Sequence, residues 1–171
     1  MLIYLIILAA VAARFIPHMP NFAPITALAI FSAAQLDWKK AAGITLAARL
    51  ASDLFLGFFS WPLMLAVYAS HLAGILFGLW IKRRQSWARI GLSSLASSAL
   101  FFLVTNFAFL YAEYPHNFSG IMQSYVNGLP FLRGTLVGDL GYTAALFGAL
   151  ALAKYFASGR TKILSSVRPL S

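Results

Sequence analysis

Six apolar segments, separated by short stretches that carry most of the charges and prolines, constrain this chain more than any other feature. They span about 2–16, 22–36, 40–59, 61–81, 87–111 and 131–157. A helix needs about 20 residues to cross roughly 30 Å of hydrocarbon, which the last four segments satisfy. The first two are shorter and predict a tilted or partly re-entrant hairpin. Only 10% of the residues are charged, against roughly 25% in soluble domains. We therefore predict an all-α membrane protein, a compact bundle of six transmembrane helices in a single domain over residues 1–171.

The cations between the segments fall mainly on one side of the predicted bundle. Ten of the thirteen lie there: Lys39, Lys40, Lys82, Arg83, Arg84, Arg89, Lys154, Arg160, Lys162 and Arg168. Because basic loops stay in the cytoplasm, we expect both termini to be cytoplasmic and the protein to be a multi-pass protein of the bacterial cytoplasmic membrane. The net charge of +9 does not indicate a nucleic-acid partner, because the cations form no stripe with stacking aromatics.

The stretch from Arg14 to Pro24 interrupts the first two segments on the side expected to face outward. Three prolines in its last eight residues forbid a continuous helix. It also carries His18 and Asn21. Irregular backbone beside a bilayer survives only in water, inside protein or lining a cavity. We expect this stretch to cap an outward-facing pocket, with Arg14 as the counter-ion for an acidic group.

Several charged residues lie within the apolar segments, where a charge costs about 2.5–3.5 kcal/mol. Arg49 and Asp53 are four residues apart and can pair on one helical face. A structural ion pair and a binding role both remain open for them and for Asp139. Most polar residues of the segments and outer loops fall in the outer half of the bundle, which favours a site open to the outside over a channel. The candidate substrate-binding residues are Arg14, His18, Asn21, Arg49, Asp53, His71, Asn106, Arg133 and Asp139.

Two further patterns concern packing and lids. Gly74 and Gly78 form a GxxxG motif, which is typical of close helix packing within a bundle. The segment 112–130 mixes aromatic and amide side chains, and we expect it to be an outer loop that closes over the bundle as a second lid.

The sequence indicates no metal site, no cofactor and no catalytic residues. It has no cysteine, and its three histidines share no ligand spacing. A single histidine could still ligate a metal held within a cofactor. An intramembrane enzyme that uses His71 with Ser93, Ser97 or Ser98 is a weaker alternative, because nothing like a nucleophile elbow surrounds these serines.

The motif Arg-x-x-Pro-His-x-Pro-Asn-Phe-x-Pro-x-x-Ala-Leu-Ala begins at Arg14, and Ser-Asp-Leu-Phe-Leu-Gly covers 52–57. Through these motifs and its six short helices, the chain resembles an uncharacterised bacterial membrane family. That family is similar to the substrate-binding S components of energy-coupling factor (ECF) transporters. The resemblance covers nearly the whole chain. It implies a vitamin-type ligand near the outer face, capped by the loops that join helices one and two, three and four, and five and six. It also implies docking on a transmembrane subunit that works with two ATPases.

These observations favour a membrane protein that binds a small external solute for uptake, for example a vitamin such as cobalamin. The partners expected are this small-molecule ligand, the lipid bilayer and an energy-coupling transmembrane subunit with ATPases. Some cobalamin-binding S-component relatives occur without dedicated partners, so a transporter that works alone remains an alternative. A structural or assembly protein without a ligand is the main alternative, although a mere scaffold gains nothing from the polar outer cluster.

Overall fold

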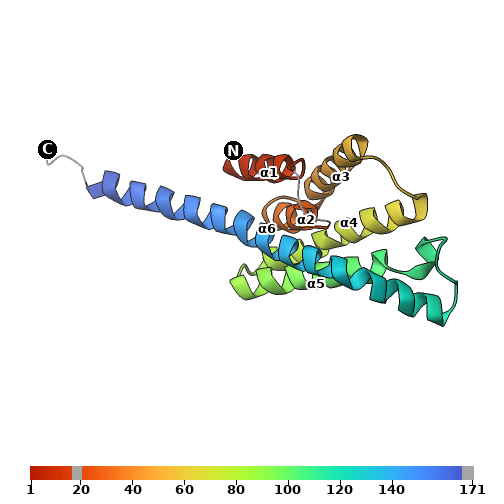
Figure 1. The fold of residues 1–171 in the computed structure, drawn as a ribbon. Helices are drawn as coiled ribbons and strands as arrows, with labels where there is room; N and C mark the ends of the chain where they lie inside the picture. Colours follow the sequence, from red (N-terminus) through yellow and green to blue (C-terminus); the bar gives the residue numbers. More distant parts are fainter. Residues whose placement is uncertain (17–20, 167–171) are drawn as a thin grey trace.

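The computed structural model describes residues 1–16 and 21–166, with side chains as far as Ser158. The described residues form six α-helices and a short 3-10 turn (Figure 1), which confirms the all-α fold with six helices. The elements are α1 (Leu2–Ala13), α2 (Ile25–Gln35), α3 (Trp38–Leu56), α4 (Trp61–Arg83), α5 (Trp87–Thr105), η1 (Ala108–Leu110) and α6 (Phe118–Ser166).

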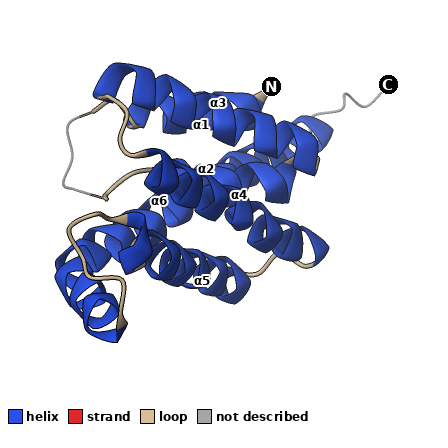
Figure 2. Ribbon diagram, turned by 90° about the vertical axis from the view of Figure 1, so that its right-hand side faces the viewer, coloured by secondary structure: helices blue, strands red, loops and turns tan. Residues whose placement is uncertain are grey.

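Helix α2 lies at the centre of the bundle. Figure 2 shows it between α1 and α3 on one side and α4, α5 and α6 on the other, and it packs against all five. Its residues 25–34 are all buried, including Thr26 and Ser32. A helix that is apolar on every face is stable only when it is enclosed by others. This short helix therefore forms the core around which the longer ones are arranged.

Glycines on α4 allow the closest of these contacts. A side chain added at Gly78 would overlap the carbonyl oxygen of Ile30 and lie 2.7 Å from the Cβ of Ala33. At Gly74, one turn earlier, the nearest atom to an added Cβ would be the Cβ of Ala29 at 3.4 Å. The predicted GxxxG motif thus packs within the molecule, against small residues of α2.

In the part of the chain that the structure describes, three helices are long and apolar enough to cross a membrane: α4, α5 and α6. This supports the prediction of a membrane protein. Helices α1 and α2 are apolar but short, with 12 and 11 residues, as predicted. Helix α3 has 19 residues, but it does not join the three candidate spans. It contains Lys39, Lys40, Arg49 and Asp53, which lower its hydropathy.

The segment 112–130, predicted as a loop, is largely helical. Helix α6 begins at Phe118 and continues through Pro130. Asn117 starts it, since its Oδ1 accepts a hydrogen bond of 3.0 Å from the backbone N–H of Gly120. Conversely, α5 ends at Thr105, before the predicted residue 111. With 49 residues, α6 is about 74 Å long and exceeds the thickness of a bilayer.

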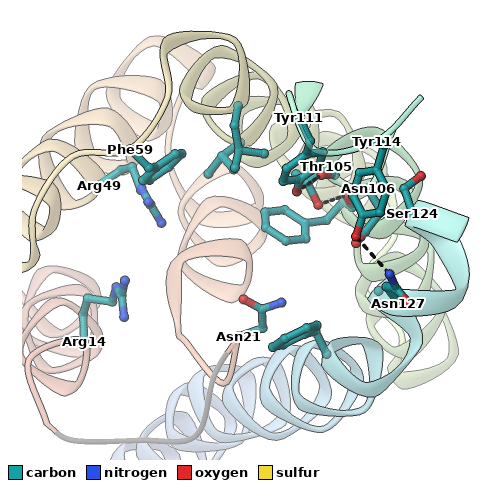
Figure 3. A pocket seen from close by; sticks show the side chains of 15 residues that line it. Arg14, Asn21, Arg49, Phe59, Thr105, Asn106, Tyr111, Tyr114, Ser124 and Asn127 are labelled. Atoms are coloured by element: carbon teal, nitrogen blue, oxygen red, sulfur yellow. Dashed lines mark hydrogen bonds between the residues drawn. The ribbon is translucent and has the colours of Figure 1, made fainter. Parts of the chain in front are cut away.

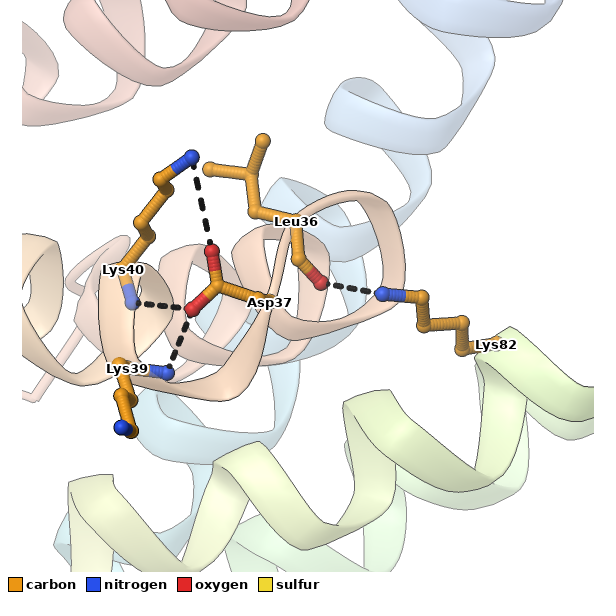
Figure 4. Close-up of polar contacts among 5 residues, drawn as sticks. All are labelled: Leu36, Asp37, Lys39, Lys40 and Lys82. Atoms are coloured by element: carbon orange, nitrogen blue, oxygen red, sulfur yellow. Dashed lines mark hydrogen bonds and ion pairs between the residues drawn. The ribbon is translucent and has the colours of Figure 1, made fainter.

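The end of the bundle where α2 is followed by α3 is held by polar contacts (Figure 4). The ammonium group of Lys82, at the end of α4, donates a 2.6 Å hydrogen bond to the carbonyl of Leu36. Asp37 caps α3 by accepting hydrogen bonds from the backbone N–H groups of Lys39 and Lys40. The backbone N–H of Lys40 and its nearby charge keep the pKa of Asp37 below the usual value. These contacts tie the cation-rich turns together.

We expect Gly78→Ala to destabilise the protein by about 3 kcal/mol, because the new methyl group meets the α2 backbone instead of a flexible side chain. Gly91→Ala on α5 is the matched control, since nothing lies within 4 Å of its added Cβ. Thermal unfolding in detergent would measure both. An unchanged melting temperature for Gly78→Ala would contradict the close α2–α4 contact.

Candidate functional site

A cavity of about 400 Å³ (Figure 3) opens near the start of α2, at the end of the bundle opposite the Asp37 turn that follows α2. Three connections contribute to its lining: Asn21 precedes α2, Phe59 lies between α3 and α4, and Tyr111 and Tyr114 lie between α5 and α6. Residues far apart in the sequence thus meet around one space. Its volume falls within the range of about 300–1,000 Å³ that is typical of small-molecule sites.

One wall carries a buried ion pair. The Arg49 side chain binds Asp53 in a bidentate pair through one edge of its guanidinium, with Nε–Oδ2 at 3.0 Å and Nη2–Oδ1 at 2.8 Å. The Tyr68 hydroxyl donates a third bond of 2.8 Å to Asp53. The guanidinium also lies over the rings of Phe59 and Tyr68, with its carbon 5.5 and 5.8 Å from the ring centroids. The predicted pair is therefore confirmed, and its surroundings fix Arg49 at the cavity edge.

Arg14 reaches the same cavity from the end of α1, and Asn21 from the start of α2 (Figure 3). Burial lowers the pKa of Arg14, as does the charge of Arg49, while Asp53 opposes the shift. Asn21 has a φ of 58°, in the left-handed region that asparagine tolerates better than most residues. This turn places its amide in the cavity lining.

The opposite wall is neutral and combines phenols with amides. Asn106 ends α5 and donates from Nδ2 to the Phe102 carbonyl at 2.9 Å, while Asn127 of α6 donates to the Tyr114 hydroxyl at 3.2 Å. Burial, followed by the neighbouring Tyr114 and Glu113, raises the pKa of Tyr111. Its phenol therefore stays neutral, and it donates to the Thr105 carbonyl.

A smaller cavity of about 70 Å³ lies deeper in the bundle. Arg14, Asn21 and Arg49 line both spaces, so the small cavity is an annex of the large one. Its other polar lining residues are Thr26, His71, Thr135 and Asp139. The Asp139 carboxylate accepts a 2.7 Å bond from the Ser98 hydroxyl and is also bonded by Thr26. Thr26 lies 3.4 Å from His71 Nδ1 and so joins the two.

The structure brings most of the candidate residues together. Arg14, Asn21, Arg49 and Asn106 line the large cavity, His71 and Asp139 line the annex, and Asp53 stands behind Arg49. Arg133 is exposed on α6 and lines neither space. His18 lies outside the described residues.

Sequence reasoning missed several lining residues because it treated residues 112–130 as a loop. Ser124, Asn127 and Gly128 belong to the first turns of α6. A usable signal was present at Asn117, a good helix N-cap that precedes an apolar run.

Among residues 1–16 and 21–158, no three His, Cys, Asp or Glu side chains gather closely enough to hold a metal ion. The described contacts of His71 are with Thr26 and with the ring of Phe101, which it stacks upon at 5.1 Å. Ser98 donates to Asp139 instead of to His71. This part of the bundle thus resembles a polar core network more than a nucleophile with its base.

The fold and the site define an all-helical protein whose described residues include three helices able to cross a membrane, with a cavity of mixed lining at one end. The chain belongs to a family of unknown function, DUF6580, whose model matches residues 1–161. No curated protein and no solved structure matches it. The family has no known activity, and none of these comparisons links the chain to ECF S components.

The ion pair generates a stability prediction. We expect Asp53→Ala to cost about 3–5 kcal/mol, because it leaves the Arg49 cation buried without its carboxylate. The double variant Arg49→Met/Asp53→Leu should lose much less, since no charge remains to be compensated. Thermal unfolding in detergent tests both, and equal losses in the two variants would contradict a compensating pair.

Proposed function

We propose that this protein binds a small external solute in the 400 Å³ cavity and serves its uptake across the bacterial cytoplasmic membrane. The observation that carries the proposal is the convergence of Arg14, Asn21, Arg49 and Asn106, from the α1–α2 connection, α3 and the end of α5, on one cavity. A packing defect would be lined by apolar groups, whereas this lining is mixed and includes two guanidinium groups.

The charge distribution supports an outward-facing cavity. Lys39, Lys40, Lys82 and Arg89 lie at the opposite end of the bundle, close to the Asp37 turn. If basic ends stay in the cytoplasm, the cavity faces outward and both termini are cytoplasmic. A solute from outside then reaches the cavity directly.

The closed inner end favours a binding subunit over a channel. Buried apolar residues fill the bundle around α2 below the cavity, so a bound solute needs a rearrangement to cross. This suits the mode of an ECF S component, which docks on an energy-coupling transmembrane subunit with ATPases. The cavity volume lies at the small end of the usual range for ligands, and it favours a compact vitamin over cobalamin.

Blocking the cavity tests solute binding. Leu63 of α4 lines the cavity, whereas Leu65, two residues on, is 52% exposed on another face. We expect Leu63→Trp to reduce co-purification of a small molecule strongly, because the larger indole intrudes into the cavity, while Leu65→Trp keeps it. Native mass spectrometry of protein in lipid nanodiscs gives the readout. Equal occupancy in both variants, or an empty wild-type protein that responds to no vitamin-type compound, would refute binding in this cavity.

The orientation has its own test, which the absence of cysteine simplifies. Ser119 is exposed near the cavity end and Gln85 at the opposite end. In intact spheroplasts we expect a membrane-impermeant maleimide to label Ser119→Cys at once and Gln85→Cys only after lysis. The reverse pattern would place the cavity on the cytoplasmic side.

A further inference from the structure

We propose that the solute is an organic anion, a carboxylate or a phosphate ester, whose charged group lies between Arg14 and Arg49. The inference rests on the proposed function and names the class of solute. The described residues that line the large cavity include two arginines and no carboxylate. In Figure 3 both guanidinium groups lie on the same side of the cavity, across from the phenols and from the amides of Asn106 and Asn127.

The geometry of Arg49 leaves part of its guanidinium for a ligand. Asp53 is bonded through Nε and Nη2, which is one edge of a planar group with five N–H donors. The Nη1 side belongs to the other edge, and Arg49 lines the cavity. The ion pair thus holds the arginine in place while its remaining donors suit a second carboxylate or a phosphate.

The local charge favours an anion. Arg14, Arg49 and Asp53 interact electrostatically and sum to one positive charge. In a site shielded by protein and lipid, this excess interacts more strongly with an anion than it would in water. The nearest further carboxylate among the lining residues, Asp139, belongs to the annex and is bonded to Ser98. A cationic solute would instead meet two arginines on reaching the cavity.

The other residues that line the cavity indicate the chemistry of the rest of the solute. Phe59, Phe101, Tyr111, Tyr114 and Phe131 offer aromatic surface, which suits a flat or compact apolar part. The amides of Asn21, Asn106 and Asn127 lie near the cavity centre or on the wall opposite the arginines. They would hydrogen-bond neutral polar groups at the other end of the solute.

The identity of the bound molecule is the first test. Native mass spectrometry of the wild-type protein, followed by extraction and fragmentation, should identify a bound compound with a carboxylate or phosphate group. This compound should be strongly depleted in the Leu63→Trp variant. A neutral or cationic compound at this site would overturn the anion proposal and leave solute binding intact.

Matched probes provide the second test for protein stripped of bound solute. Three pairs differ mainly in the anionic group: nicotinate and nicotinamide, pantothenate and pantothenol, pyridoxal phosphate and pyridoxal. We expect an anionic member to raise the melting temperature more than its neutral partner. An equal or larger shift with the neutral member would overturn the anion proposal alone. If no probe binds and nothing co-purifies, the proposed function itself fails.

Variants of Arg14 test where the anionic group of the solute binds. Arg14→Gln should weaken binding of the anionic compound about 10–100-fold, since a hydrogen bond to a charged group is lost, while Arg14→Lys should lose less. Arg133→Gln is the control, because Arg133 is exposed and lines neither cavity. The Arg14→Gln affinity for the neutral partner should change little. Equal losses for the anionic and neutral partners, or for Arg133→Gln, would contradict contact between the anion and Arg14.

Discussion

The enclosure of α2 is the constraint on which the rest of this structure depends. This helix has 11 residues, is buried on every face and packs against the five other helices. The closest of these contacts require places where side chains are small. Gly78 supplies such a place against Ile30 and Ala33. Because α2 is too short to span the bundle, the space above its first turn is not filled by its backbone, and the cavity lies there, next to Asn21 and Thr26.

The charges of the site are placed by the helices that surround α2. Arg49 and Asp53 of α3 pair with each other with little exposure, and Tyr68 of α4 completes the hydrogen bonding of Asp53. Arg14 enters from α1. The same arrangement that secures packing therefore leaves two guanidinium groups at the cavity, and this connects the stability of the bundle to the proposed recognition of an anion.

Much of the fold could be predicted because hydrophobic segments and their spacing report directly on membrane helices. The starts of α1, α4 and α5 agree with the predicted segments, and so does the i, i+4 pairing of Arg49 with Asp53. The predicted start of α6 was wrong. Gly128 and Pro130 are typical loop residues, but Gly128 is used for the close approach of Asn106 and Pro130 is accommodated within the helix. At both positions tertiary packing outweighed the local preference of the residue for a loop.

The sequence by itself determined the class of protein, the six helices, the interrupted stretch after Arg14 and the ion pair, because each depends on composition or on spacing along one helix. Only the tertiary structure decided which polar residues meet. It joined Asn21 to Asn106 and Asn127 around one cavity, moved His71 and Asp139 into an annex and left Arg133 outside. Those relations depend on how the helices are rotated and packed around α2, which no pattern within a single segment specifies.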